Sequence, residues 1–457
     1  MFRRLIVAST LTPAAIGILL FAAGCANQPP PPPPKPVPPV VIAPKPSEPE
    51  PEVLAPVMLG IDVLEAEGFK AVAGKRIGLL THPAGVNRRG ESTINVLRRA
   101  PGVKLVALFS PEHGLYGNFA ASTNYQDSTD SATGLPVISL YTGKPGSQKP
   151  SPAQLKGLDA LVIDLQDIGV RSYTFSSAML CAMAGCFEAG VEVIVLDRPN
   201  PLGGLKVGGP PLDPDQKSYV GAFRVPYMHG LTIGELAKLA RETPGVMAIP
   251  EIINVPERVR LKGRLTIIPM RGWKRSMHWP DTGLRWHSTS RFITSYEAAV
   301  GYALVGLGAQ NSGWTSGIGS FYPFRGIGFA KKTPAQILAE FNQFKIPGIQ
   351  LNLTNGVDRD GKVIEGVYVD VSDWETLRPV ELSLYMHKLA VKWSPKNPFA
   401  SLTRAEARTF TIHVGSAAWL AALQRNGAKV DVAAFIQNWT ERAAIYQQQS
   451  RKYWLYQ

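Results

Sequence analysis

The feature that most constrains the fold of this chain is a regular alternation of short apolar runs with helical stretches. The apolar runs lie at 76–81, 103–109, 135–141, 158–164 and 191–197, and the helical patterns lie at 91–99, 172–189 and 231–242. Strands that are apolar on both faces are typical of a parallel sheet covered by helices on both sides. The sequence therefore predicts a doubly wound α/β domain over 58–245.

The second half of the chain mixes helical and strand patterns without this regular alternation. Helices are expected at 293–308, 333–344, 378–394, 416–425 and 430–446, and strands at 349–353 and 363–371. The glycine-rich stretch 306–328 is expected to form a loop over an interface cleft. We therefore predict a smaller α+β domain at 246–457 that packs on the first domain and completes the cleft.

Polar residues follow four of the predicted strands at the point where each strand ends. They form the runs Thr81-His82, Ser110-Pro111-Glu112-His113-Gly114, Gln166-Asp167-Ile168-Gly169-Val170-Arg171 and Asp197-Arg198-Pro199-Asn200. In open parallel sheets the ligand binds outside the carboxyl ends of the strands. This edge of the sheet is therefore the expected active site.

Glu112 and Asp167 are the predicted catalytic residues, because two carboxylates across a bound sugar are the minimum for glycoside hydrolysis. Glu112 can serve as a general acid, or it can be a carboxylate that stabilises a helix N-terminus. Asp167 can be the second catalytic group, a helix cap for 172–189, or an ion-pair partner of Arg171. Retaining, inverting and substrate-assisted mechanisms all stay open, because the separation of the carboxylates decides between them.

A wider set of polar residues is predicted to contact the substrate. The run at 197–200 can also be a structural turn, since proline and asparagine favour turns. The predicted substrate contacts are His82, His113, Gln166, Arg171, Tyr173, Asp197, Arg198, Asn200, His229 and Arg275.

Several other chemistries lack their sequence signatures. No glycine-rich dinucleotide or phosphate-binding motif follows the first strand, and no Gly-x-Ser-x-Gly elbow or His-Glu-x-x-His motif is present. We therefore expect no cofactor and no metal, although a site made of carboxylates alone stays open. The formal net charge of +13 favours an anionic partner, yet no basic stripe with interleaved aromatics predicts nucleic-acid binding.

The N-terminal sequence is typical of a targeting segment. Residues 1–24 have a basic start, an apolar stretch and small residues before Cys25, which is the pattern of a secretory signal peptide. The segment resembles a bacterial lipobox, which implies acylation of Cys25, although an uncleaved membrane anchor stays open. Proline dominates 25–57, which predicts an extended spacer. The other two cysteines, Cys181 and Cys186, are expected to be buried free thiols.

The globular part resembles the bacterial exo-β-N-acetylmuramidases, a family first defined as a domain of unknown function. The matching stretches include 60–62, 78–81, 109–114, 139–141, 164–174, 196–204, 229–236, 272–275 and 453–456. The resemblance implies a Rossmann-like first domain, a catalytic Glu112, and release of N-acetylmuramic acid from the non-reducing ends of peptidoglycan fragments in cell-wall recycling. It also implies a cation for the lactyl carboxylate of muramic acid, for which Arg171, Arg198 and Arg275 are the candidates.

The chain also departs from the family pattern. His82 stands where asparagine is usual, the Pro-Ser-Pro-Asn run is replaced near Ser288-Thr289-Ser290-Arg291, and acidic positions are lost in 308–325. These losses motivate a second hypothesis, a non-catalytic or altered-specificity peptidoglycan-binding lipoprotein of the same fold. Under either hypothesis the partners are peptidoglycan fragments or muramyl sugars, and the expected location is the periplasm, with a lipid anchor in the outer membrane of a Gram-negative bacterium.

Overall fold

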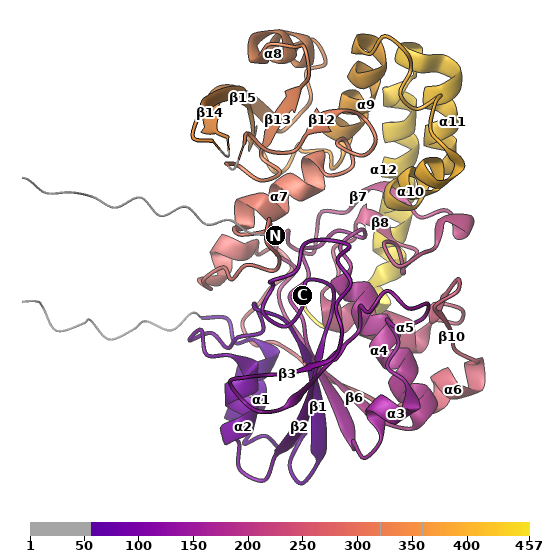
Figure 1. The fold of residues 1–457 in the computed structure, drawn as a ribbon. Helices are drawn as coiled ribbons and strands as arrows, with labels where there is room; N and C mark the ends of the chain where they lie inside the picture. Colours follow the sequence, from indigo (N-terminus) through magenta and orange to yellow (C-terminus); the bar gives the residue numbers. More distant parts are fainter. Residues whose placement is uncertain (1–55, 320, 359) are drawn as a thin grey trace, which may run out of the picture. The chain divides into compact units, whose positions relative to one another are not determined.

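The computed structural model describes residues 56–319, 321–358 and 360–457 (Figure 1). The predicted signal peptide at 1–24, Cys25 and the spacer up to residue 55 lie outside these residues. Within the described ranges, no helix is both long and apolar enough to cross a membrane.

A seven-stranded sheet forms the first half of the molecule. Its strands lie in the order β11-β6-β5-β1-β2-β4-β3, and all neighbours are parallel except β3 and β4. Numbered along the chain, the six parallel strands give the order 3-2-1-4-5-6, which is that of the Rossmann fold. The predicted doubly wound α/β architecture is thus confirmed. The strands are β1 (Arg76–Thr81), β2 (Lys104–Ser110), β3 (Ser128–Thr129), β4 (Pro136–Ser139), β5 (Ala160–Asp164), β6 (Glu192–Leu196) and β11 (Leu265–Ile268).

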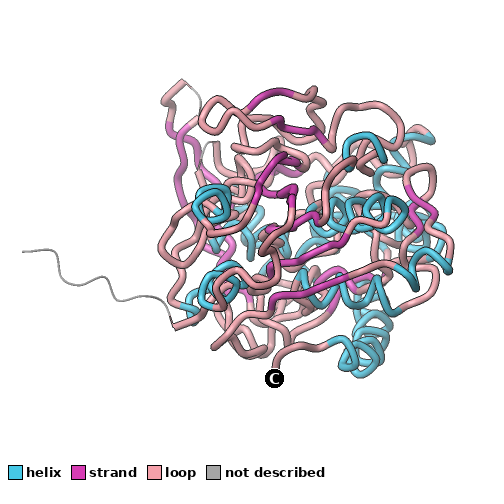
Figure 2. Tube along the Cα trace, turned by 90° about the horizontal axis from the view of Figure 1, so that it is seen from below, coloured by secondary structure: helices cyan, strands magenta, loops and turns pink. Residues whose placement is uncertain are grey.

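The sheet has a hydrophobic core on each face because side chains alternate along each strand. In β5, Leu161 and Ile163 enter one core, while Ala160 and Val162 enter the other. Figure 2 shows the strands in the middle of the molecule with helices on both sides. The helices of this half are α1 (Gly60–Ala66), α2 (Thr93–Arg99), α3 (Pro152–Leu155), α4 (Phe175–Ala189), α5 (Ile233–Glu242) and α6 (Glu257–Lys262).

Helix α4 is apolar all round and lies buried between the sheet and the rest of the molecule. Cys181 and Cys186 are both buried in it and unpaired, as predicted. Burial raises the pKa of both thiols, so they stay protonated and inert.

A second, antiparallel sheet lies in the other half, in the order β12-β13-β15-β14. The predicted loop at 306–328 is corrected here, because it contains the first two of these strands. The strands are β12 (Trp314–Thr315), β13 (Gly326–Phe329), β14 (Ile349–Val357) and β15 (Val363–Val371). The helices are α7 (Tyr296–Val305), α8 (Pro334–Asn342), α9 (Glu381–Trp393), α10 (Arg404–Val414), α11 (Ala417–Asn426) and α12 (Val432–Ser450).

Short elements connect the two halves. Strands β7 (Gly208–Pro211) and β8 (Pro226–Met228) pair with each other, as do β9 (Ala248–Ile249) and β10 (Ile253–Asn254). Helix α12 packs along β7, and the last residues of the chain then return to the first domain. Because β11 lies in the large sheet, this sheet extends beyond residue 245. The 3-10 turns are η1 (Pro214–Gln216), η2 (Trp279–Thr282), η3 (Gly427–Lys429) and η4 (Arg451–Tyr453).

Candidate active site

Glu112 lies in a tight turn directly after β2. The Gly114 N–H donates to the Pro111 carbonyl at 3.0 Å, and His113 takes a positive φ of 74° at the third position of the turn. That left-handed conformation is uncommon for a residue other than glycine. Residues 112–127 contain no helix, so the alternative of a helix N-terminal carboxylate is wrong for Glu112. His113 Nδ1 contacts the Phe119 carbonyl at 3.1 Å and stabilises the loop that follows.

Both carboxylate oxygens of Glu112 are held by hydrogen bonds. Oε1 accepts the Ser122 N–H at 2.8 Å, and Oε2 accepts the Thr174 hydroxyl at 2.8 Å. Burial, together with Glu112, raises the pKa of the neighbouring Tyr141 to about 12, so this phenol keeps its proton. A hydroxyl such as that of Thr174 can donate or accept, so it can follow a carboxyl group that gains and loses a proton.

Asp167 follows β5, and within the described residues only one of its two carboxylate oxygens accepts a hydrogen bond. Oδ2 accepts the Gly169 N–H at 2.9 Å and lies 3.5 Å from His229 Nε2. Oδ1 is buried and has no hydrogen-bond partner in the described part of the chain. His229 Nδ1 accepts the Leu231 N–H at 3.2 Å, which leaves Nε2 as the ring nitrogen that faces Asp167. Such a buried open oxygen is suited to receive a hydrogen bond from a substrate.

Neither structural alternative for Asp167 holds. The residue preceding α4 is Thr174, so Asp167 does not cap that helix. The Arg171 guanidinium binds backbone carbonyls instead of Asp167.

Tyr302 of α7 lies beside the segment that follows β5. Its hydroxyl lies 3.3 Å from Ser172 Oγ, next to the strand-end run that contains Asp167. Burial raises the pKa of Tyr302, and Glu112 and Asp167 both raise it further by their charge. Glu112 and Asp167 follow β2 and β5, which flank β1 in parallel, so both carboxylates lie at the same edge of the sheet. No sequence motif marks Tyr302, which lies within an ordinary apolar helix.

His82 and Gln166 meet where the strand order reverses, between β1 and β5. His82 Nε2 accepts the Gln166 N–H at 2.9 Å. Burial and, after it, the nearby Arg198 hold the pKa of His82 well below its usual range. The Gln166 side-chain amide donates to the Asp167 carbonyl at 2.8 Å and to the Pro199 carbonyl at 2.9 Å. This pair therefore fixes the backbone that carries Asp167.

The three predicted arginines are fully buried and already bound within the protein. Arg171 donates to the carbonyls of Pro210, Val225, His413 and Val414. Arg198 pairs with Asp164 at 2.5 Å, and Arg275 pairs with Glu235 at 2.7 Å. A guanidinium held in this way cannot turn to a ligand carboxylate without breaking a buried ion pair or hydrogen bonds. The expectation that these arginines bind the lactyl carboxylate is therefore corrected.

Comparison with known proteins relates this arrangement to one family. Residues 77–297 match the family described as the N-terminal domain of the exo-β-N-acetylmuramidase NamZ, and residues 300–456 match its C-terminal domain. The chain belongs to the NamZ family. It is 36% identical to the peptidoglycan β-N-acetylmuramidase NamZ of Bacillus subtilis strain 168 over 338 residues, which are 73% of this chain and 77% of that protein.

Two solved structures of DUF1343 family proteins from Bacteroides fragilis have the same fold as this NamZ-family chain. One is 32% identical with a TM-score of 0.76 and covers 88% of this chain and all of its own. The other is 25% identical with a TM-score of 0.64, over 88% of this chain and 99% of its own.

Asp197 and Asn200 have structural roles in this NamZ-family protein. Fully buried Asp197 accepts four hydrogen bonds, and burial raises its pKa to about 6. Asn200 accepts the Leu202 N–H and donates to the Leu231 carbonyl. The run at 197–200 is therefore a structural turn, and the alternative of sugar binding is corrected for these two residues.

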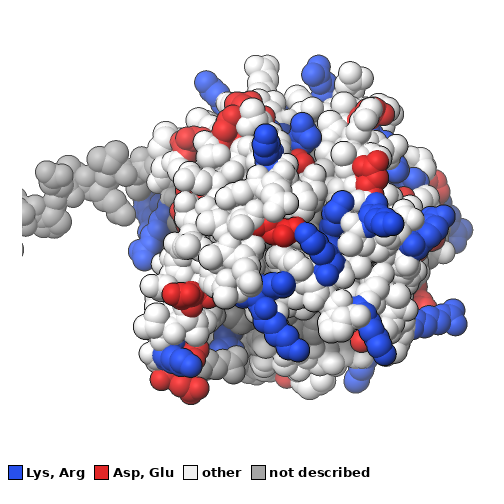
Figure 3. Space-filling model, turned by 90° about the horizontal axis from the view of Figure 1, so that it is seen from above, with Lys and Arg blue, Asp and Glu red and all other residues white. Residues whose placement is uncertain are grey.

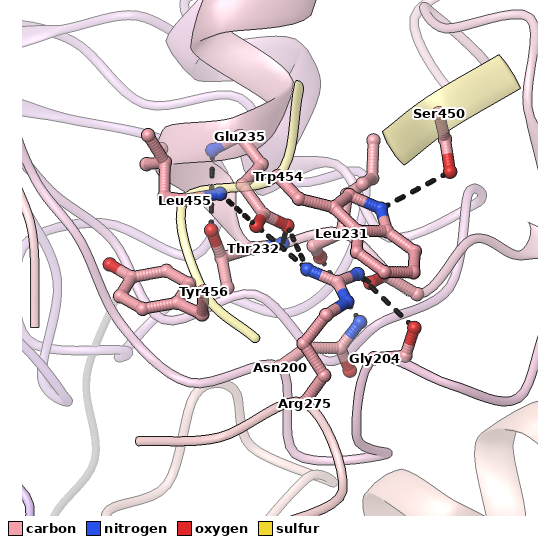
Figure 4. A network of polar contacts seen from close by, with 12 residues as sticks. Asn200, Gly204, Leu231, Thr232, Glu235, Arg275, Ser450, Trp454, Leu455 and Tyr456 are labelled. Atoms are coloured by element: carbon pink, nitrogen blue, oxygen red, sulfur yellow. Dashed lines mark hydrogen bonds and ion pairs between the residues drawn. The ribbon is translucent and has the colours of Figure 1, made fainter. Parts of the chain in front are cut away.

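The C-terminal tail completes a buried network beside this turn (Figure 4). Tyr456 donates to Asp197 at 2.6 Å, and the Leu455 N–H donates to Glu235 at 2.8 Å. Trp454 stacks on the Arg275 guanidinium at 3.9 Å. The last residues of the NamZ-family chain thus stabilise charges in its first domain. Among the described residues, no cluster of three or more His, Cys, Asp or Glu side chains could hold a metal.

Proposed function

We propose that the chain is an exo-acting β-N-acetylmuramidase that releases N-acetylmuramic acid from the non-reducing ends of peptidoglycan fragments, as in cell-wall turnover and recycling. The observation that carries this is the NamZ-family match across both domains, together with the positions of Glu112 and Asp167 directly after the parallel strands β2 and β5. The carboxylates that glycoside hydrolysis requires are both present. A purely binding function, suggested by the acidic residues missing from 308–325, is therefore not favoured.

Glu112 is the group that donates a proton to the glycosidic oxygen. Ser122 and Thr174 fix the orientation of its carboxyl group, and Thr174 can accept as well as donate a hydrogen bond. Asp167 presents its unpaired Oδ1 to the sugar, while the Gly169 N–H binds its Oδ2 and His229 Nε2 lies 3.5 Å from that oxygen. Asp167 is thus the second carboxylate, either as a reacting group or as a partner for the substrate's acetamido group.

The test compares wild type with Glu112→Gln on a chromogenic β-N-acetylmuramide and on a muramyl disaccharide. Loss of general acid catalysis lowers kcat by about 10²- to 10⁴-fold. The matched control is Glu365→Gln, which makes the same chemical change at an exposed position of β15. Equal rates in wild type and Glu112→Gln would remove Glu112 from the mechanism, and the absence of sugar release by wild type would remove the proposed activity.

The same proposal places the enzyme in the periplasm, anchored by lipid on Cys25 with 25–57 as a spacer. This rests on the signal-like residues 1–24 and the proline-rich composition that follows. A polyproline helix rises about 3.1 Å per residue, so a spacer of this composition would hold a protein domain away from the membrane. On the face drawn in Figure 3, Lys and Arg side chains are interspersed with Asp and Glu, so the basic charge there does not form one stripe.

Metabolic labelling with a fatty acid and membrane fractionation test the anchor. We expect label on the wild-type protein and none on Cys25→Ser, which should leave the membrane fraction. Label that persists in Cys25→Ser would contradict the assignment.

A further inference from the structure

The proposed substrate carries a lactyl carboxylate, and this carboxylate needs a cation that the protein itself does not already use. Arg171, Arg198 and Arg275 are bound to internal partners and buried. The cation must therefore come from another part of the chain that reaches the site.

The loop at 286–293 reaches the site from the second half of the chain. Thr289 Oγ1 accepts the Tyr173 hydroxyl at 2.8 Å, and the charge of Asp167 acts on this same phenol. The Thr289 backbone also lies beside the His82 imidazole. Thr289 is fully buried, so this point of the loop is fixed against the predicted catalytic edge of the sheet.

A tight turn follows Thr289 and presents two exposed residues. The turn is closed by hydrogen bonds from the Thr289 N–H to the Ile293 carbonyl and from the Ile293 N–H to the Ser290 carbonyl, both at 3.2 Å. Arg291 and Phe292 at its tip are exposed, between buried Ser290 and buried Ile293. Two residues span at most about 7 Å, so Arg291 stays close to Thr289.

Arg291 and Phe292 offer complementary groups for an acidic sugar. The guanidinium carbon of Arg291 lies 5.7 Å from the centre of the Phe292 ring, and within the described residues Arg291 forms no ion pair with a carboxylate. A guanidinium binds a carboxylate through two parallel hydrogen bonds, and an exposed aromatic ring offers an apolar surface to the sugar.

We propose that Arg291 binds the lactyl carboxylate of the terminal muramic acid, with Phe292 beside it against the sugar. This rests on the proposed muramidase function and names the residue that selects muramic acid over a sugar without the lactyl acid. Arg291 contributes to substrate binding, and Glu112 donates the proton.

The test measures kcat and KM for a chromogenic β-N-acetylmuramide and for its lactyl methyl ester, which keeps the shape and removes the charge. Arg291→Ala should raise KM for the acid about ten-fold, as expected for one lost charge-assisted contact, with kcat within two-fold. The KM for the ester should not change. Arg291→Lys should recover part of the loss, because it keeps the charge without the two parallel bonds.

Arg425→Ala on α11 removes the same charge from an exposed position in the second domain and is the matched control. An equal KM increase for acid and ester, no increase in Arg291→Ala, or an equal increase in Arg425→Ala would each overturn the proposal. If wild type does not cleave the muramide, the proposed function fails. Calorimetric titration with N-acetylmuramic acid and its methyl ester then tests Arg291 separately, and equal affinity of wild type for both ligands would overturn it.

Discussion

At the residue scale, Thr174 is predicted to matter for activity more than for stability. Its hydroxyl donates to Glu112, although it lies just before α4, where a threonine commonly caps the helix. Its side chain makes no capping hydrogen bond. Thr174→Ala should therefore lower kcat about ten-fold, because Glu112 loses one of its orienting partners, while KM and the unfolding midpoint change little.

Thr333 is the matched control for Thr174, because it precedes α8 and its hydroxyl does accept the Gln336 N–H. Thr333→Ala should reduce the free energy of unfolding by about 1 kcal/mol and leave kcat unchanged. Thermal unfolding and steady-state kinetics on both variants separate the two roles. Unchanged kcat in Thr174→Ala would show that Ser122 alone orients Glu112.

The position of Glu112 and Asp167 at one edge of the sheet could be predicted, because carboxyl ends of parallel strands meet at the same edge. The buried ion pair of Arg198 could not be predicted. Its partner, Asp164, is 34 residues away in sequence, and no local pattern shows which carboxylate a guanidinium will meet. Tyr302 was missed for a similar reason, since only the packing of α7 against Ser172 brings it to the site.

At the element scale, apolar runs predicted the strands of the buried sheet well, because both faces of that sheet are covered. The second sheet was harder to predict, because β14 consists mostly of exposed and half-buried residues and β12 has only two residues. Helices α1 and α10 were not predicted. Helix α1 contains a glycine at its start, whose missing side chain lets it approach the Asp197 backbone closely.

Helix α9 is joined to its neighbours through a buried neutral histidine, which predicts a pH-dependent stability. The His387 Nε2–H faces the Leu307 carbonyl at 2.8 Å, and Nδ1 accepts the Trp419 N–H at 3.0 Å. Burial lowers the pKa of His387 to about 4 from 6.5. A lowered pKa in the folded state gives stability that is present above pH 6.5 and is lost as the pH falls towards 4.

The loss from His387 amounts to about 3 kcal/mol across that window, at 1.36 kcal/mol per pKa unit. Urea unfolding between pH 7 and pH 4 measures it. His387→Gln keeps a donor and an acceptor but cannot take up a proton, so its stability should fall less steeply with acid than that of wild type. Parallel pH dependences for the two proteins would show that His387 is not the titrating group.

At the scale of the whole molecule, the doubly wound α/β architecture follows from the sequence pattern. The contacts of the C-terminal tail do not follow from it. Residues 454–456 come from the far end of the sequence, yet they contact Glu235 and Arg275 of the first domain (Figure 4). Tyr456 also donates a hydrogen bond to Asp197. Such contacts depend on the complete fold, so no local pattern of residues predicts them.

The C-terminal tail is therefore predicted to stabilise the first domain from outside its own sequence. Tyr456→Phe removes one donor from buried Asp197 and should reduce the free energy of unfolding by about 1.5–3 kcal/mol, the range for hydrogen bonds to charged groups. Deleting 454–457 should cost more, because Asp197, Glu235 and Arg275 lose partners together. Urea unfolding followed by fluorescence and circular dichroism measures both changes. Tyr368→Phe, which removes a half-buried hydroxyl from β15, is the control, and an equal loss in that variant would contradict a specific role for the tail.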